Sequence, residues 1–260
     1  MEWAIQQTVE NQSQTLSYKE VSYEVKPGFK VGFGIDLPHD HWDVLTQYTW
    51  FNTNGNDRFQ GVIISPFLCS KLAFMNPYES AKMVANLRFN MFDLELRRNI
   101  EVTERLKLRP LIGLKGGWID QALRTKWKKN EITAYENLKN NFSGGGLQLG
   151  INGTWLFTPS FGLTSDFKAA FMWGHFYIED DFKDTLSTHV KTSVGNRNFG
   201  SLSIQGFLGF YLEIEPDFSS KFGYEIQDFF NQYQILDNAT GTHSNDLILQ
   251  GLTVSACLNF

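Results

Sequence analysis

The chain of 260 residues lacks the long apolar run, about 18 residues or more, that a membrane-spanning helix requires. Its two cysteines cannot make the disulfide framework of a small secreted domain. It has no block of basic residues, and its net charge of −5 argues against nucleic acid as the main partner. Charged residues make up 20% of the chain and aromatic residues 15%, a composition that excludes a disordered chain.

The sequence has instead a two-residue alternation of apolar and polar side chains, which is typical of β-strands. Between Leu106 and Trp118, for example, the large apolar residues occupy mainly even positions, and lysine and arginine occupy odd ones. Each such segment predicts a strand with one apolar face and one polar face. The segments are Val21–Asp36, Trp42–Trp50, Leu106–Trp118, Leu147–Phe157, Phe161–Trp173, Leu202–Ile214, Phe222–Gln227 and Ile248–Phe260.

In a further segment, Met83–Arg98, the alternation of apolar and polar residues shifts by one position. Its apolar residues occupy odd positions up to Phe89 and even positions from Phe92 onwards. One extra residue near Met91 would restore the faces, so this pattern predicts a β-bulge there. The side chains expected to point inward after the bulge are Asp93, Glu95 and Arg97.

The connections alternate between tight and long. The tight ones are Leu37–Asp40, Asn99–Glu104, Thr158–Ser160 and Pro216–Phe218. The long ones are Asn52–Lys82, Asp120–Asn141, Glu179–Gly200 and Gln234–Asn245. Long strands with tight turns at one end and long loops at the other are typical of outer-membrane barrels. The sequence therefore predicts one domain, residues 1–260, folded as an all-β, transmembrane, antiparallel up-and-down β-barrel of about ten strands.

The apolar faces carry almost no charge, as expected of a surface in lipid, where Arg or Lys at mid-depth costs roughly 2–4 kcal/mol. A soluble barrel, the alternative, would show charges mixed into its outer faces. Asp228 is the exception on the outward side, and a bulge or a position near the rim would explain it. Tryptophans near strand ends suit a membrane interface, and these are Trp42, Trp50, Trp118, Trp155 and Trp173.

The structure expected for the beginning of the chain follows from the need to close the barrel. A barrel in lipid must pair its first strand with its last, because lipid offers no partner to backbone N–H and C=O groups. The strands from Val21 onwards are odd in number, whereas bacterial single-chain barrels have even numbers. We therefore expect Glu2–Thr8 to be the upper part of a truncated first strand that pairs beside Asp246–Phe260 near the outer rim. The alternative is a frayed terminus outside the barrel.

The end of the chain resembles the C-terminal signal that the barrel-assembly machinery of Gram-negative bacteria reads. The residues of this assembly signal are Leu252, Val254, Ala256, Leu258 and Phe260.

Five longer stretches, in order along nearly the whole chain, resemble the major-outer-membrane-protein-like, pore-forming family of Legionella and Chlamydia relatives. They are PGFKVGFG (27–34), HDHWD with YTWF (39–51), DLELRRN (93–99), LRPLIGLKGGWIDQ (108–121) and DLILQGLT (246–253). The resemblance implies a pore-forming barrel in a bacterial outer membrane, with its long loops extracellular. Members of this family begin upstream of Glu2–Ile5 with a signal peptide and the start of a first strand, and residues 1–20 show no signal-peptide pattern.

The inward faces collect charges of both signs. One interpretation is a charged pore lining that selects ions. The other is a plug of paired charges, and the count of about ten strands favours it, because about eight strands leave an interior just filled by side chains. The lining residues are Lys30, Asp43, Asp93, Glu95, Arg97, Arg109, Lys115, Asp166, Lys168, Glu213 and Glu225.

Catalysis is a weaker hypothesis, and we expect no enzyme activity, cofactor or metal. An omptin-like protease would use acidic residues and a histidine at the outer rim. The candidates are His175 with Asp180 and Asp181, and His243 with Asp246. His39 and His41 lie in a tight turn that does not bring metal ligands together.

The function that the sequence favours is a porin-like barrel that passes small solutes or ions, or serves as a structural surface barrel. The alternative is a surface binding protein or adhesin that acts through the loops Asn52–Lys82 and Asp120–Asn141. The expected partners are the lipid bilayer, the barrel-assembly machinery and small solutes, and no nucleic acid.

Overall fold

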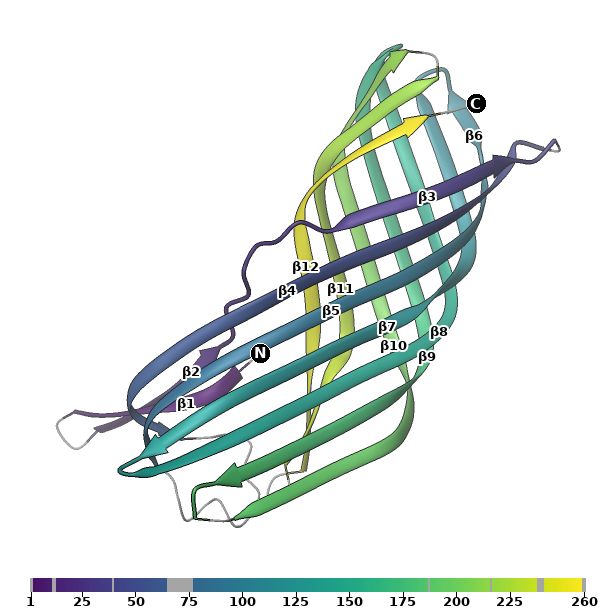
Figure 1. Cartoon of the computed structure of the whole chain (residues 1–260). Helices are drawn as coiled ribbons and strands as arrows, with labels where there is room; N and C mark the ends of the chain where they lie inside the picture. The colour runs from purple at the N-terminus through teal and green to yellow at the C-terminus, as the bar shows by residue number, and fades with distance from the viewer. Residues whose placement is uncertain are drawn as a thin grey trace.

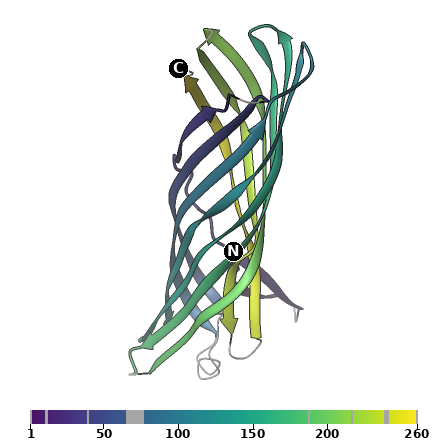
Figure 2. The ribbon, with the colours of Figure 1, turned by 90° about the vertical axis from the view of Figure 1, so that its right-hand side faces the viewer.

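The protein, seen in a computed structural model, consists of strands that form one antiparallel sheet. The sheet curls into a barrel-like shape (Figure 1), and Figure 2 shows it turned by a quarter. The structure describes residues 2–10, 13–38, 40–64, 77–186, 188–215, 217–237 and 241–258. Within these ranges, no helix is long and apolar enough to cross a membrane. The prediction of an all-β, antiparallel, up-and-down fold is confirmed.

The strands differ widely in length. The shortest, β6, has 4 residues, and the longest, β8 and β10, have 27 each. Most of them far exceed the common length of about 5–6 residues in globular sheets. In chain order they are β1 (Glu2–Glu10), β2 (Ser13–Glu20), β3 (Phe29–Asp36), β4 (Trp42–Ile64), β5 (Tyr78–Arg98), β6 (Ile100–Thr103), β7 (Leu106–Lys129), β8 (Ile132–Thr158), β9 (Phe161–Asp184), β10 (His189–Glu215), β11 (Phe218–Asp237) and β12 (Gly241–Leu258).

Neighbours in the sheet follow the chain in the order β12-β11-β10-β9-β8-β7-β5-β4-β1-β2, with β3 beside β4 and β6 beside β7. Strand β3 covers only one end of the edge of β4, from Asp43 to Trp50. The segment before β3 contains Pro27, which lacks a backbone N–H, and its one bridge to the sheet joins Tyr23 and Gly55. The predicted strand Val21–Asp36 is therefore regular only from Phe29.

The predicted pairing of Glu2–Thr8 with the last strand is wrong. These residues are extended, but β1 pairs with β2 as a hairpin and with β4 at Ile63 and Ile64. Strand β4 is much longer than β3, so its far edge is left for β1. Among the described residues, β12 pairs only with β11, and a seam separates it from β3.

The predicted long loops are also wrong wherever the structure describes them. Strand β4 continues to Ile64, and β7 continues to a tight turn at Asn130, whose positive φ of 52° suits such a turn. The segments Glu179–Gly200 and Gln234–Asn245 likewise lie mostly in β9 to β12. Of the predicted tight turns at the other end of the strands, Thr158–Ser160 joins β8 to β9 as expected, whereas Asn99–Glu104 consists mostly of the short strand β6. Residues 39 and 216 of two further predicted turns lie outside the described residues.

The predicted bulge near Met91 is absent. Strand β5 pairs without a shift from Ser80 to Arg97 with β7, so all of its odd positions point inward. Leu87 and Phe89 are buried inside the barrel, whereas Phe92 and its even-numbered successors are exposed outside. The apolar residues therefore change sides of a regular strand. Asp228 does lie beside an irregularity, because the pairing of β11 shifts after Phe229.

This change of side divides the barrel into two halves. At the end that holds the C-terminus, outward side chains are large and apolar, such as Leu94, Leu114 and Leu149, which are all exposed. We call this the apolar-faced half. Beyond it, outward positions hold residues such as Lys82 and Lys126, and we call that the charged-faced half.

The inside of the barrel changes in the opposite sense. In the apolar-faced half, inward positions carry charged and polar side chains, as detailed below. In the charged-faced half most of them are apolar and form two clusters of buried residues, one around Trp127 and Phe182 and one around Phe89 and Phe142. Outward tryptophans mark the boundary: Trp50 and Trp118 lie on one register line, each paired with Asn90.

Candidate functional site: a charged chamber

The interior of the apolar-faced half contains a cavity of about 1770 Å³. It is lined by inward side chains of the strands, by the chain segment before β3 and, at the seam, by both faces of β12 from Asn245 to Cys257. Of the predicted lining residues, it touches Lys30, Glu95, Arg97, Arg109, Asp166, Lys168, Glu213 and Glu225. Asp43 does not line the cavity but pairs with Arg97, which does, and Asp93 and Lys115 pair with each other outside the lining.

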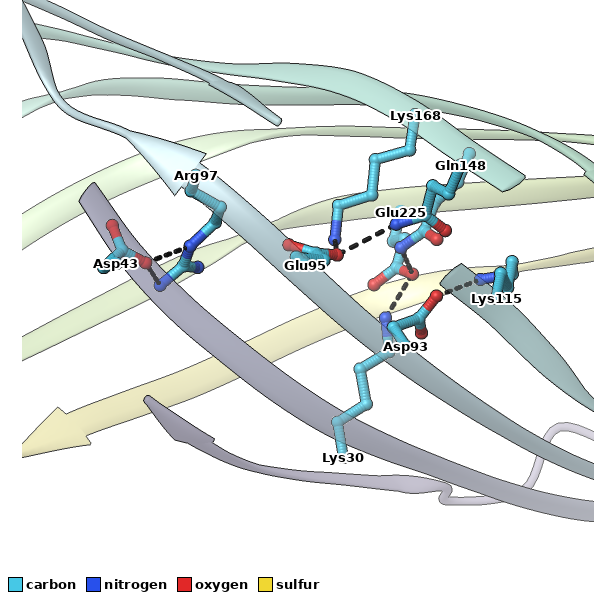
Figure 3. A network of polar contacts seen from close by, with 10 residues as sticks. Lys30, Asp43, Asp93, Glu95, Arg97, Lys115, Gln148, Lys168 and Glu225 are labelled. Atoms are coloured by element: carbon cyan, nitrogen blue, oxygen red, sulfur yellow. Dashed lines mark hydrogen bonds and ion pairs between the residues drawn. The ribbon is translucent and has the colours of Figure 1, made fainter. Parts of the chain in front are cut away.

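Two buried ion pairs lie in the interior of the apolar-faced half (Figure 3). Lys115 and Asp93 are register partners on β7 and β5, and Nζ lies 2.9 Å from Oδ1. Glu95 accepts hydrogen bonds from Lys168, on the distant strand β9, and from Gln148 Nε2 at 3.0 Å. The side chains are 1% to 9% exposed, so each charge depends on its partner to offset lost hydration.

Small residues make room for the Glu95 cluster. Gly150 is the register partner of Lys168, and a Cβ added there would lie 3.1 Å from Cγ of that lysine and 2.5 Å from the carbonyl oxygen of Phe167. Gly113 is the register partner of Glu95, and a Cβ there would lie 2.2 Å from the carbonyl oxygen of Leu94. Larger side chains at these positions would displace the strands.

A second cluster lies nearer the C-terminal end of the barrel. Asp43 on β4 pairs with Arg97 on β5, and its other oxygen lies 3.7 Å from Nε of Arg109 on β7. Arg109 also donates a hydrogen bond of 2.9 Å to Asn99 Oδ1. Its side chain is 35% exposed, compared with 5% for Asp43, so Arg109 is the member that meets the water of the chamber.

A third cluster crosses the seam. Lys30 on β3 pairs with Glu225 on β11, past the unpaired edge of β12. Glu225 also accepts hydrogen bonds from Gln205 Nε2 at 3.0 Å and from Thr253 Oγ1 at 3.2 Å. Side-chain contacts thus connect the two edges of the sheet where backbone pairing is missing.

The remaining predicted lining residues stay apart from these clusters. Glu213 accepts a long hydrogen bond of 3.4 Å from the hydroxyl of Tyr211. Asp166 lines the cavity, and its Oδ1 has no hydrogen-bond partner among the described residues. The amide and hydroxyl groups of Gln148, Gln205 and Thr253 were missed as site residues, although their inward positions in the alternation could have identified them.

Apolar side chains close the chamber toward the charged-faced half. Phe89 and Phe229 contact edge to face at 5.4 Å between ring centroids, and Phe142 and Phe176 contact in a tilted arrangement at 4.7 Å. All four are at most 1% exposed. Together with Met91, Ile119, Met172 and Leu247, they fill the interior directly beyond the ion pairs.

The assembly-signal residues lie on the outer face of β12. Leu252, Val254 and Leu258 are 61% to 74% exposed, and Ala256 is also exposed. Phe260 lies outside the described residues.

The catalytic candidates do not come together. His175 faces outward beside Asn198 at 3.0 Å, whereas Asp180 has the opposite parity on the same strand. Asp181 instead pairs with His189 at 2.7 Å. His39 and the side chain of His243 lie outside the described residues, and the part of the chain that is described holds no cluster of three His, Cys, Asp or Glu side chains suited to a metal.

A long-stranded sheet with an apolar outer band, a border of outward tryptophans and charges inside is the arrangement of a membrane β-barrel. The chain belongs to the family of the Legionella pneumophila major outer membrane protein precursor, whose family model matches residues 2–260. It is thus an outer-membrane protein that associates with the lipid bilayer. A search of curated proteins returns no match.

Proposed function

We propose that the protein is a porin-like barrel whose charged chamber admits small solutes or ions and whose apolar interior restricts their passage. The observation that carries this proposal is that a water-accessible, charged cavity and a cluster of buried apolar side chains lie next to each other inside the same barrel. Rings of charge select ions, and apolar constrictions gate channels by excluding water. No enzymatic step is part of this function.

The proposal includes an orientation. The C-terminal strand carries the outward apolar residues expected of the assembly signal, so the apolar-faced half begins at the periplasmic side and the assembly machinery reads β12 from there. The charged-faced half then projects beyond the outer leaflet. The tightly paired charges inside the apolar-faced half favour a narrow path with low conductance over a wide aqueous channel.

The experiment is planar-bilayer recording with the purified protein. We expect small conductance steps, and we expect Arg109→Gln to shift permeability toward cations, because it removes the most exposed positive charge of the Asp43 cluster. Arg105→Gln, an exposed residue in the turn before β7, is the matched control and should leave selectivity unchanged. Silence of the wild-type protein would favour a purely structural barrel, and unchanged selectivity would remove Arg109 from the conducting path.

A further inference from the structure

Three positive side chains lie next to each other on the outer surface of the charged-faced half. Arg58 on β4 is the register partner of Lys82 on β5, and Lys82 is the register partner of Lys126 on β7. All three occupy outward positions, and Arg58 and Lys82 are exposed. We call these residues the cation row.

The cation row is unfavourable for the fold by itself. Like charges directly opposite each other on neighbouring strands destabilise a sheet. Within the described residues, none of the three side chains forms an ion pair, and Lys126 contacts only the ring of Tyr135, at 5.3 Å from its centroid. Arg88, Arg124 and Lys128 add positive charge to the same strands, against the carboxylates of Asp57, Glu79 and Asp120.

The neighbouring strands show how the same level of the barrel is arranged when its charges are balanced. On β8 to β10, Glu179 pairs with Lys139 at 3.0 Å and with Lys191 at 2.9 Å. Asp181 pairs with Lys183 at 3.3 Å and with His189 at 2.7 Å. The excess of positive charge is therefore local to β4, β5 and β7.

The position of the cation row relative to the apolar band identifies the kind of anion. On β7, the outward positions run from Leu114 through Trp118 to Arg124 and Lys126. Lys126 lies eight residues beyond Trp118, roughly 26 Å along the tilted strand. A molecule whose acyl chains cover Leu114 therefore reaches the row only with a headgroup that extends past Trp118 along the same face. A free anion would gain nothing from this continuity.

We propose that the cation row binds the phosphate groups of an anionic glycolipid whose acyl chains pack on the apolar-faced half. Arginine and lysine donate charge-assisted hydrogen bonds to phosphate oxygens, and the bound anion offsets the repulsion within the row. This inference uses the orientation given under Proposed function, which places the row outside the membrane, on the side of the outer leaflet. It does not depend on conduction.

The test measures binding of bis-phosphorylated lipid A to the full chain in neutral detergent micelles by calorimetric titration. We expect the triple variant Arg58→Gln, Lys82→Gln, Lys126→Gln to bind at least roughly tenfold more weakly, and wild-type binding to weaken as salt is raised. Lipid A without its phosphates should bind both proteins equally weakly. Because the row repels itself, the triple variant should also resist unfolding at least as well as the wild type, which a merely structural role of these residues would not give.

The matched control is Arg98→Gln, Arg105→Gln, Lys107→Gln, which removes three exposed cations at the opposite end of the barrel and should leave binding unchanged. Lys82→Gln alone removes the middle charge and serves if the triple variant does not fold. Equal affinity of wild type and Lys82→Gln, equal binding of lipid A with and without phosphates, or full competition by inorganic phosphate would each overturn the proposal. Loss of lipid binding with normal conductance, or the reverse, separates this inference from the proposed pore.

Discussion

The two halves of the barrel are built from the same strands but follow opposite rules. On β5, odd positions point inward throughout, yet they hold Asp93 and Glu95 in one half and Leu87 and Phe89 in the other. The outward positions change in the opposite direction, from Leu94 to Arg88. The apolar-faced half thus has the polarity of a membrane barrel, and the charged-faced half has that of a soluble one.

The difference shows what the environment selects at each position. Lipid outside leaves the interior as the only place for charged groups, which then need partners such as the Asp93–Lys115 pair. Water outside lets the interior fill with apolar side chains that exclude water. A barrel whose strands cross this boundary without a bulge or a break must exchange apolar and polar side chains between its outer and inner faces at one level. The register line of Trp50, Asn90 and Trp118 marks that level.

The largest expected effect comes from emptying the apolar interior. Phe229 is fully buried against Phe89, so we expect Phe229→Ala to lower the free energy of unfolding by about 3–5 kcal/mol and to raise the conductance of the proposed pore. Phe222→Ala on the same strand is the control: its ring is 49% exposed on the apolar face, where lipid chains can fill the space. If urea titrations of vesicle-embedded protein show the same loss of unfolding free energy for both variants, the contrast between the halves is contradicted.

The alternation of side chains was enough to predict an all-β barrel and the inward charges of the apolar-faced half. The prediction failed where apolar side chains were assumed to point outward along the whole length of a strand. From Leu87 to Phe92 the change of face resembled a bulge, because apolar residues were assumed always to point outward. The same assumption made the charged outward positions of β7, such as Arg124 and Lys126, resemble a loop.

The partners of the charged residues could not be predicted from the pattern either. The pairing of β6 with β7 shifts by one residue between Glu101 and Thr103. A register counted from the turn without this shift would place Lys115 opposite Leu94, on the wrong face. Glu95 and Lys168 lie on strands separated by β7 and β8, so their contact depends on the curvature of the sheet.

A smaller effect is expected from charge placed on the outer surface. Leu149 and Asn137 have the same outward parity on β8, one in each half. Leu149→Arg should lower the free energy of unfolding in vesicles by about 2–4 kcal/mol, because arginine would lie in lipid, whereas Asn137→Arg should change it little. If both variants unfold at the same urea concentration, the boundary between the halves has been placed wrongly.

The smallest expected effect tests the balanced charges of β8 to β10. Hydrogen bonds from Lys191, Tyr177 and Lys139 lower the pKa of Glu179 from 4.5 to about 2. Because the folded protein favours the ionised form, its stabilising contribution is present above about pH 4.5 and is lost as the pH falls toward about 2. The change in stability should be small, since the lysines are exposed and screened by water.

The titration of this carboxyl group can be followed directly by NMR in micelles. We expect a midpoint near pH 2 in the wild type and a higher midpoint in Lys191→Gln, which removes the donor that lowers this pKa most. Lys183→Gln is the matched control, because Lys183 contacts Asp181 instead and should leave the midpoint of Glu179 unchanged. A wild-type midpoint near 4.5 would mean that these cross-strand pairs do not persist in solution. The charges of β8 to β10 would then be as unpaired as the cation row, and the contrast that singles out β4, β5 and β7 would be lost.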